Sequence, residues 1–296
     1  MARIDIQFSL FSAFYSPLIS TFSAGFLQEE GLEPEWSISP PGVSAVAAIE
    51  SGSAHVIQSA LSQGFNSLAK GEEPAAVHFA QINEMDGFFL TARDPDPDFT
   101  WDKLEGADIV LFAGGQPNAM FKYACHKAGI DYHKINAINP GGAADIDAAF
   151  RAGQGSYVQQ QGPFPQQLEA DGVGHVVAQV GKLIGPCGFS SLAARREWLE
   201  TDMAKAFMRA YEKTRLYLNE MPAAVIAKAE TSYFPDIDEA VLANCIATYQ
   251  QLGCWTPHVE ITRPAFEAIL DIFEYIGSLN ERYRYEQICV MPPATN

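Results

Sequence analysis

The sequence predicts an α/β protein built from two lobes, each with its own open sheet. The chain has 296 residues and is 48% hydrophobic, which is more than a single average domain uses. Strand and helix patterns alternate up to residue 186, as is typical of largely parallel sheets covered by helices. From Thr201 onward the pattern is almost wholly helical, so the last helices must pack on a sheet formed earlier in the chain.

The charge balance is acidic and excludes several classes of partner. There are 36 acidic and 19 basic residues, giving a net charge of −17, and the basic residues are scattered. We therefore expect neither nucleic acid nor an anionic membrane surface as a partner. No run of about 18 apolar residues occurs, so we expect no membrane insertion. The first ten residues resemble a strand more than a signal peptide.

The cysteines and histidines predict neither a disulfide framework nor a metal site. The five cysteines are far apart and show no CxxC spacing, and the six histidines show no HExxH or paired spacing. We expect no cofactor. The cysteines are Cys125, Cys187, Cys245, Cys254 and Cys289.

The first block, up to residue 92, consists of strand-then-helix units. Ile4, Ile6 and Phe8 alternate with polar residues and predict a strand. Ser16 and Pro17 are an N-cap and a first-turn proline for a helix that ends at Gly31. The same patterns predict strands at 33–38, 55–59, 75–82 and 87–92, and helices from Ser44 to about Gly52 and at 61–69.

A second block of the same kind follows a surface loop. Residues 93–98 hold two prolines and three acids, which indicate a loop at a natural boundary. A strand at 107–112, a turn at 113–116 and a helix at 117–128 come next, and Gly129 ends that helix. Later strands are predicted around Ile135 and at 156–158 and 175–180, with helices at 143–152 and 163–170.

The terminal helices, predicted at 203–218, 222–229, 237–252 and 264–279, fix the expected domain organisation. They have no sheet of their own, so the chain must return to the first lobe near residues 185–192. We therefore predict that residues 1–92 and 187–296 form lobe 1 and that residues 93–186 form the smaller lobe 2. Two crossovers, near residues 92 and 187, would then act as a hinge.

Five segments, in the correct order, resemble one known family. They are FLQEEGLE (26–33), VSAVAAIESGSA (43–54), GGQPNAMFKYACHKAGI (114–130), AAFRAGQGSYVQQQGPFPQQL (148–168) and residues 192–207. They are similar to segments of the solute-binding proteins of alkanesulfonate-, nitrate- and pyrimidine-precursor-type ABC transporters. These proteins share the type 2 periplasmic-binding-protein fold with fungal thiamine-pyrimidine synthases. The resemblance implies two hinged lobes that hold a ligand between strand ends and helix N-termini, the edge at which open α/β sheets generally bind ligands.

In the first lobe, that geometry points to three groups of candidate ligand-binding residues. Tyr15 can stack on a flat ligand; the alternative is that Phe14 and Tyr15 are packing residues between the loop and the core. Ser44 can be a ligand contact or only an N-cap. The candidates are Phe14, Tyr15 and Ser16, then Ser44 in the turn 42–44, and Ser59 with Gln63.

In the second lobe, the candidates surround a turn and a glutamine run. The glycines of the turn permit a close approach and the amides supply hydrogen bonds, although a plain tight turn is the alternative. The glutamine run lies where the resembled proteins have a Glu-Pro pair facing the cleft, and Gly162-Pro163 stands in that place here, so a carboxylate is missing. The candidates are Gly114, Gly115, Gln116 and Asn118 at the turn, Gln160 and Gln161 in the run, and Cys187 at the second crossover.

The resemblance to the synthases does not imply that this chain shares their catalytic activity. Their active lysine falls on Ser59 and their histidine on Gln63, and of their cysteine patch only Cys187 remains. A hydroxyl and an amide cannot replace a Schiff-base amine and an imidazole. A lyase or hydrolase with Cys187 as its nucleophile is the alternative, but no histidine is placed to activate that thiol. Glu84 and Asp86 fit a solvated turn.

The predicted function is capture of a small organic ligand. No lysine or arginine lies at the predicted tips, which favours a neutral or heteroaromatic molecule over one gripped through a salt bridge. The resemblance implies an ABC transporter permease as a partner, and a cytoplasmic ligand sensor is an alternative. The expected location is the periplasm if a leader was removed, and the cytoplasm if Met1 is the native start.

Overall fold

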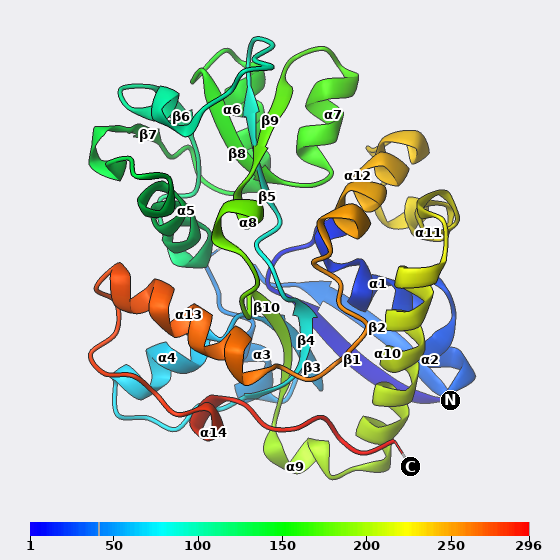
Figure 1. Cartoon of the computed structure of the whole chain (residues 1–296). Helices are drawn as coiled ribbons and strands as arrows, with labels where there is room; N and C mark the ends of the chain where they lie inside the picture. The colour runs from blue at the N-terminus through cyan, green and yellow to red at the C-terminus, as the bar shows by residue number, and fades with distance from the viewer. Residues whose placement is uncertain (41, 296) are drawn as a thin grey trace.

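The computed structural model describes residues 1–40 and 42–295, which form two five-stranded sheets, each flanked by helices (Figure 1). The first sheet has the order β2-β1-β3-β10-β4 and the second has the order β7-β6-β8-β5-β9. The strands are β1 (Ala2–Phe8), β2 (Leu32–Ile38), β3 (Val56–Ser59), β4 (Val77–Asn83), β5 (Phe88–Ala92), β6 (Asp108–Val110), β7 (Asn136–Ile138), β8 (Tyr157–Gln161), β9 (His175–Gln179) and β10 (Ser190–Ala194).

Each sheet is parallel except at the strand that arrives from the other sheet. In the first sheet β1 pairs in parallel with β2 and β3, whereas β10 is antiparallel to β3 and β4. In the second sheet β6 pairs in parallel with β7 and β8, whereas β5 is antiparallel to β8 and β9. The prediction of two mainly parallel sheets is confirmed, with these exceptions.

The position of β5 corrects the expected first crossover. The segment 87–92 was expected to end the first lobe, but β5 pairs with β8 and β9 in the second sheet. The chain therefore crosses at residues 84–87, and the expected crossover near residue 92 is wrong. The alternation of apolar residues identified the strand correctly, but a strand pattern does not say which sheet the strand joins.

The two crossing segments lie side by side between the sheets. The first runs from β4 to β5 and the second runs from α8 (Val180–Ile184) to β10 (Figure 1). The Cys187 N–H donates to the Glu84 carbonyl at 2.9 Å, and the Phe189 N–H donates to the Asn83 carbonyl at 3.1 Å. Backbone hydrogen bonds thus hold the second crossover, residues 185–189, against the first.

The helices cover both sheets, and the C-terminal ones pack mainly around the first. The expected helix from Ser16 to Gly31 is broken at Gly25, which has a φ of 82°, and Ser16 is the first residue of α1 instead of its N-cap. The helices of four or more residues are α1 (Ser16–Ser23), α2 (Phe26–Glu29), α3 (Val46–Ser51), α4 (Ser62–Ala69), α5 (Gly115–Ala128), α6 (Ala143–Arg151), α7 (Phe164–Ala170), α8, α9 (Arg196–Leu199), α10 (Asp202–Glu220), α11 (Ala223–Glu230), α12 (Glu239–Leu252), α13 (Arg263–Tyr275) and α14 (Tyr285–Ile288).

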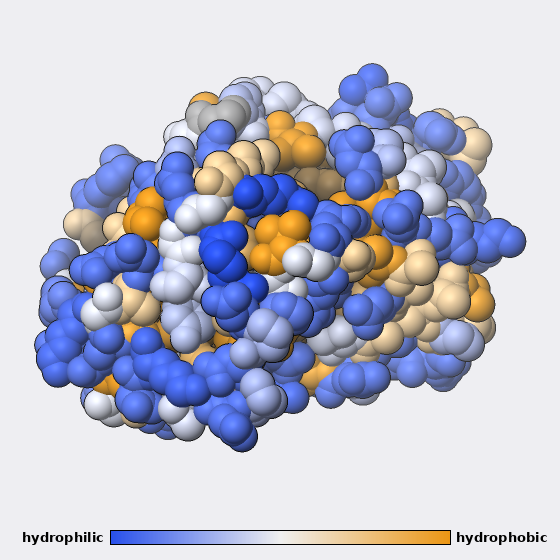
Figure 2. Space-filling view, turned by 90° about the horizontal axis from the view of Figure 1, so that it is seen from above, coloured by the Kyte–Doolittle hydropathy of each residue, from blue (hydrophilic) through white to orange (hydrophobic). Residues whose placement is uncertain are grey.

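Seen from above, hydrophilic residues cover most of the surface, and hydrophobic side chains are visible between them toward the middle (Figure 2). This surface agrees with the excess of acidic residues in the sequence. Within residues 1–40 and 42–295, no helix combines the length and the apolar character needed to cross a bilayer.

Candidate functional site

A cavity of about 170 Å³ lies between the two sheets. It borders the carboxyl ends of β1, β3 and β8 and the first turns of α4 and α5. This is the edge at which open α/β sheets bind ligands. The lining residues are Ser9, Leu10, Tyr15, Gln58, Ser59, Ala60, Ser62, Gln63, Gln116, Pro117, Gln161, Phe189 and Ser190.

The lining is polar, aromatic and without formal charge. Four of its residues are glutamines, four are serines and two are aromatic, whereas no aspartate, glutamate, lysine, arginine or histidine contributes. All of these lining residues belong to the part of the chain that the structure describes. Such a surface offers hydrogen bonds and stacking to a ligand but no ion pair.

Five candidates from both lobes meet at this cavity. They are Tyr15, Ser59 and Gln63 from the first lobe, and Gln116 and Gln161 from the second. Gln160, the neighbour of Gln161 on β8, lines a smaller adjoining cavity. The structure thus brings together residues up to 146 positions apart, such as Tyr15 and Gln161. Their contact with a ligand stays a prediction.

The 3-10 turn η1 (Ala13–Tyr15) directs the rings of two neighbouring aromatic residues, Phe14 and Tyr15, to different surroundings. The Phe14 ring packs against the first crossover, where a Cβ added at Gly87 would come within 2.2 Å of the ring. Tyr15 lines the cavity instead, and its hydroxyl accepts a hydrogen bond from Gln161 Nε2 at 3.4 Å. Burial raises the pKa of the Tyr15 hydroxyl, so this group stays neutral and remains available as a donor.

Gln116 bridges the two lobes. Its side-chain oxygen accepts a hydrogen bond from Ser62 Oγ at 3.1 Å, and its Nε2 donates to the carbonyl of Phe189. Ser62 belongs to α4, and Phe189 to the second crossover. The amide of Gln116 therefore links α5 to both of these segments, and its two hydrogen bonds hold the lobes together.

Two buried polar atoms of the lining have no hydrogen-bond partner among the described residues. These are Ser59 Oγ and Gln161 Oε1, on side chains that are 1% and 5% exposed. A buried polar group without a partner is costly, because it has lost its bonds to water. Both residues line the cavity. A hydrogen-bonding ligand at this point would satisfy them.

Several other candidates have structural roles and do not line the cavity. Ser16 Oγ contacts the Ala13 carbonyl and Glu230. Ser44 is not the expected N-cap, because it precedes Ala45, the N-cap of α3; its Oγ accepts from the Val46 N–H at 3.2 Å and donates to Gln63 Oε1 at 3.0 Å. Ser44 thus orients the side chain of Gln63, which lines the cavity, without lining the cavity itself.

Of the candidates at the start of α5, some have structural roles and one lines the cavity. Gly114 is the N-cap of α5 and Gly115 is its first residue, and Gly115 needs to be glycine because its φ is 67°. Asn118 Nδ2 donates to the Phe112 carbonyl and to the Tyr132 hydroxyl, both at 2.9 Å. Only Gln116, together with Pro117, reaches the cavity.

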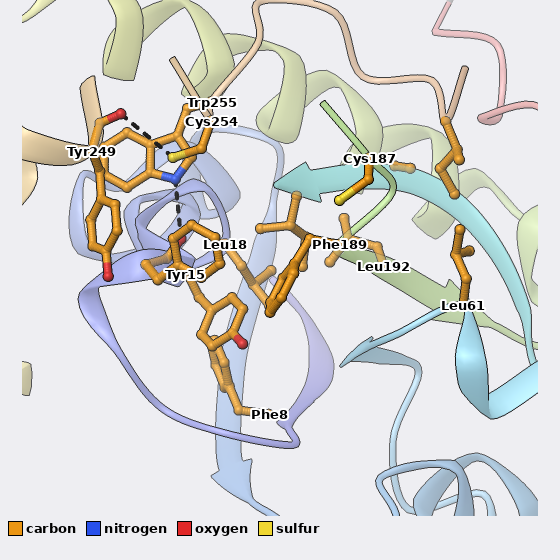
Figure 3. Close-up of a cluster of buried hydrophobic side chains, with 14 of the residues drawn as sticks. Phe8, Tyr15, Leu18, Leu61, Cys187, Phe189, Leu192, Tyr249, Cys254 and Trp255 are labelled. Atoms are coloured by element: carbon orange, nitrogen blue, oxygen red, sulfur yellow. Dashed lines mark hydrogen bonds between the residues drawn. The ribbon is translucent and has the colours of Figure 1, made fainter. Parts of the chain in front are cut away.

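Cys187 is a core residue. Its side chain is fully buried beside Phe189 and Leu192 (Figure 3). Burial raises the pKa of the Cys187 thiol, and the nearby acidic side chains of Asp86 and Glu84 raise it further. Because the thiolate is the reactive form, this environment opposes a nucleophilic role.

The solvated turn expected at Glu84 and Asp86 is wrong. Asp86 is fully buried; its Oδ1 accepts from the Phe88 N–H at 2.7 Å, and its Oδ2 has no partner within residues 1–40 and 42–295. Burial raises the pKa of the Asp86 carboxyl to about 8. Glu84 Oε2 lies 2.8 Å from Nε2 of His258. These two side chains anchor the first crossover to the protein interior.

Gln58 is the main site residue that the sequence analysis missed. Its Oε1 accepts from the backbone N–H groups of Ser9 and Leu10, at 2.9 and 3.1 Å, and Ser9 Oγ donates to the Gln58 carbonyl at 2.8 Å. Gln58 therefore holds the loop after β1 that forms one wall of the cavity. The available signal was a glutamine in the short strand β3, between two apolar residues and the candidate Ser59.

The residues present do not assemble a metal site. Within the described ranges, no three or more histidine, cysteine, aspartate or glutamate side chains cluster in a way that could hold a metal ion.

The model of the NMT1/THI5-like family matches residues 15–225, which is most of the chain. The chain belongs to the NMT1/THI5-like family. Among its relatives is YtlA of Bacillus subtilis (strain 168), which carries the name of a binding protein. The two are 28% identical over 292 residues, 97% of this chain and 87% of YtlA.

Solved structures share the fold of this NMT1/THI5-like protein at lower identity. The alkanesulfonate-binding protein SsuA from Xanthomonas axonopodis pv. citri, bound to MOPS, superposes with a TM-score of 0.75 at 17% identity, over 98% of this chain and 99% of SsuA. A ligand-binding component of an ABC-type import system from Staphylococcus aureus, with zinc bound, gives 0.75 at 14% identity over the whole of both chains. The predicted periplasmic-binding-protein fold is thus confirmed.

Proposed function

We propose that this chain is a solute-binding protein, which closes its two lobes on a small, neutral or heteroaromatic organic molecule and delivers it to an ABC transporter. The observation that carries this proposal is the uncharged cavity between the lobes, with Ser59 Oγ and Gln161 Oε1 buried and unpartnered in its lining. Family membership and the binding-protein relatives support the same function. Action as part of an import system favours a location outside the cytoplasmic membrane.

The lining also favours a neutral solute over an anion. A sulfonate or carboxylate loses its hydration on entry, and an uncharged site returns no salt bridge for it. Glutamine and serine side chains supply both donors and acceptors, which suit a carboxamide, a lactam or an amino-substituted ring. Tyr15 and Phe189 supply apolar faces for such a ring.

Catalysis is disfavoured by the same features. The positions of the synthase lysine and histidine hold Ser59 and Gln63, and the Cys187 thiol is buried with a raised pKa. The lining therefore contains neither a nucleophile of lowered pKa nor a general base.

The first experiment identifies the solute and asks whether it changes. Native mass spectrometry of the purified protein should detect a bound small molecule. This molecule should raise Tm in a thermal-shift assay and should be recovered unchanged. A charge test uses nicotinamide and nicotinate, which differ only in carboxamide against carboxylate. We expect any response to favour nicotinamide. Conversion of the solute, or a preference for anions throughout, would contradict the proposal.

Two matched variants locate the binding site. Ser59→Ala removes an unpartnered hydroxyl from the cavity, and Thr91→Val removes a buried unpartnered hydroxyl of the second sheet that does not line it. One hydrogen bond contributes about 1 kcal/mol, so Ser59→Ala should weaken solute binding by about fivefold. Thr91→Val should leave the affinity unchanged. Equal effects of the two variants would place the site elsewhere.

A further inference from the structure

A second cavity adjoins the first and differs from it in chemistry. It measures about 10 Å³ and lies between the loop after β1 and the second sheet. We call it the aromatic compartment. It is lined by Leu10, Phe11, Ser12, Phe88, Phe112, Ala143, Gln160, Gln161 and Phe164. Leu10 and Gln161 line both cavities and therefore form the wall between them.

The aromatic compartment is lined mainly by apolar side chains. Four phenylalanines from four separate segments contribute to it, and Phe88 contacts Phe112 edge to face at 6.0 Å between centroids. Of its polar groups, Ser12 Oγ donates to the Gly162 carbonyl at 2.6 Å and Gln160 Nε2 donates to Asp147 at 3.3 Å, whereas the side-chain oxygens of Gln160 and Gln161 have no partner among the described residues. Such a lining suits an aryl or alkyl group. A volume of about 10 Å³ holds at most one water molecule, so the compartment is shut in this conformation.

The backbone of the wall at Leu10 is held in place by contacts on the loop after β1. The Leu10 N–H donates to Gln58 Oε1 at 3.1 Å, and Gln58 is 3% exposed. The next residue, Phe11, stacks on Trp36 with centroids 4.8 Å apart. The loop is thus held on both sides of Leu10, so we expect truncation of the Leu10 side chain to join the two cavities without moving the main chain.

We propose that the aromatic compartment is an apolar subsite of the cleft and that Leu10 is the specificity-determining residue that closes it. This inference rests on the proposed function. With leucine at position 10, the solute is confined to the polar cavity of about 170 Å³ and must be compact. With a smaller residue there, the site accepts the same polar head carrying an aryl or short alkyl substituent.

The test uses benzene as the probe, because an apolar cavity of sufficient size binds it and no knowledge of the natural solute is needed. The variants are Leu10→Ala and the control Leu279→Ala, which removes the same atoms from a partly buried leucine outside both cavities. Benzene should raise the Tm of Leu10→Ala by about 2 °C or more and leave the wild type and Leu279→Ala unchanged. If Leu10→Ala does not fold, Leu10→Val should give a smaller rise in the same direction.

A second substitution shows where the benzene is bound. Ala143 lies on the far side of the compartment, and Ala143→Phe should fill it. Combined with Leu10→Ala, it should abolish the benzene response. Equal Tm changes in wild type, Leu10→Ala and Leu279→Ala would overturn the subsite, and so would a benzene response that Ala143→Phe leaves intact. Neither result bears on the proposed solute capture, which the experiments with nicotinamide and Ser59→Ala decide separately.

Discussion

The buried carboxyl of Glu230 should make the stability of the protein fall as pH rises, and Glu230→Gln should remove that dependence. Glu230, at the end of α11, is fully buried, and its two oxygens lie 2.7 Å from Ser16 Oγ and 2.6 Å from Ser20 Oγ. Burial raises the pKa of Glu230 to about 8. No basic side chain is bonded to it among the described residues.

Counting protons explains why the neutral form fits this site. Ser16 Oγ has one hydrogen but faces two oxygens, the Ala13 carbonyl at 2.8 Å and Glu230 Oε2. If Glu230 is protonated, it donates to Ser16, Ser16 donates to Ala13, and Ser20 donates to the other oxygen of Glu230. Every group then has a partner, whereas the carboxylate leaves two acceptors competing for one hydrogen.

The sign and size of the effect follow from linkage. Below pH 4.5, the usual pKa of glutamate, both folded and unfolded chains hold the proton, so Glu230 contributes nothing to the pH dependence. Between 4.5 and about 8 only the folded chain holds it. The free energy of unfolding therefore falls by about 1.4 kcal/mol for each pH unit in this window. Above pH 8 the loss is complete and constant.

Glutamine reproduces the protonated carboxyl, because its Nε2 can donate to Ser16 and its oxygen can accept from Ser20. Urea unfolding at pH 5.5, 6.5 and 7.5 should show that Glu230→Gln gains on the wild type by about 3 kcal/mol across this range. The control is Glu220→Gln, which changes an exposed glutamate at the end of α10 and should follow the wild type. A constant difference between Glu230→Gln and wild type from pH 5.5 to 7.5 would refute the argument.

Three further outcomes are expected. Asp86→Asn should reduce the fall in the free energy of unfolding over the same pH window, because burial raises the pKa of Asp86 to about 8 and asparagine keeps the acceptor for the Phe88 N–H. Urea unfolding at the same three pH values measures this slope, and an unchanged slope would contradict the prediction. Tyr249→Phe should lower the free energy of unfolding by about 2 to 3 kcal/mol, since the Tyr249 hydroxyl accepts from the Gly162 N–H at 2.7 Å and donates to the Gly87 carbonyl at 3.0 Å; a loss below about 0.5 kcal/mol in urea unfolding would show that these bonds do not matter. A thiol reagent should label none of the five buried cysteines in the native protein and all five in denaturant, and rapid native labelling would show that the burial is wrong.

The sequence predicted the order and type of most elements because their signals are local. Alternation at Ile4, Ile6 and Phe8 identified β1, and glycines at 129 and 253 end α5 and α12 in the left-handed conformation. The membership of β5 was missed, since the acidic, proline-rich segment 93–98 is a stronger local signal than residues 84–87. The crossover at residues 84–87 is marked by a tertiary contact, the packing of the Phe14 ring on Gly87, which no local pattern reports.

The sequence predicted those residues of the candidate site that lie at the ends of strands and at the starts of helices. Gln161 ends β8 and Gln116 lies in the first turn of α5, so both reach the cavity for reasons visible in the sequence. Phe14 and Tyr15 could not be separated, because a short turn decides which ring enters the cavity. Asp86 could not be recognised as buried, since only the packed crossovers remove it from water.

The crossovers and the cavity therefore form one packed unit, in which closure and site geometry depend on the same atoms. Tyr249, on α12, bonds both the first crossover at Gly87 and the residue after Gln161. A Cβ at Gly162 would lie 2.3 Å from Cys245 Sγ, so the end of β8 fits against α12 only because residue 162 is glycine. The glycine that follows Gln161 thus permits the close contact between β8 and α12 beside the cavity.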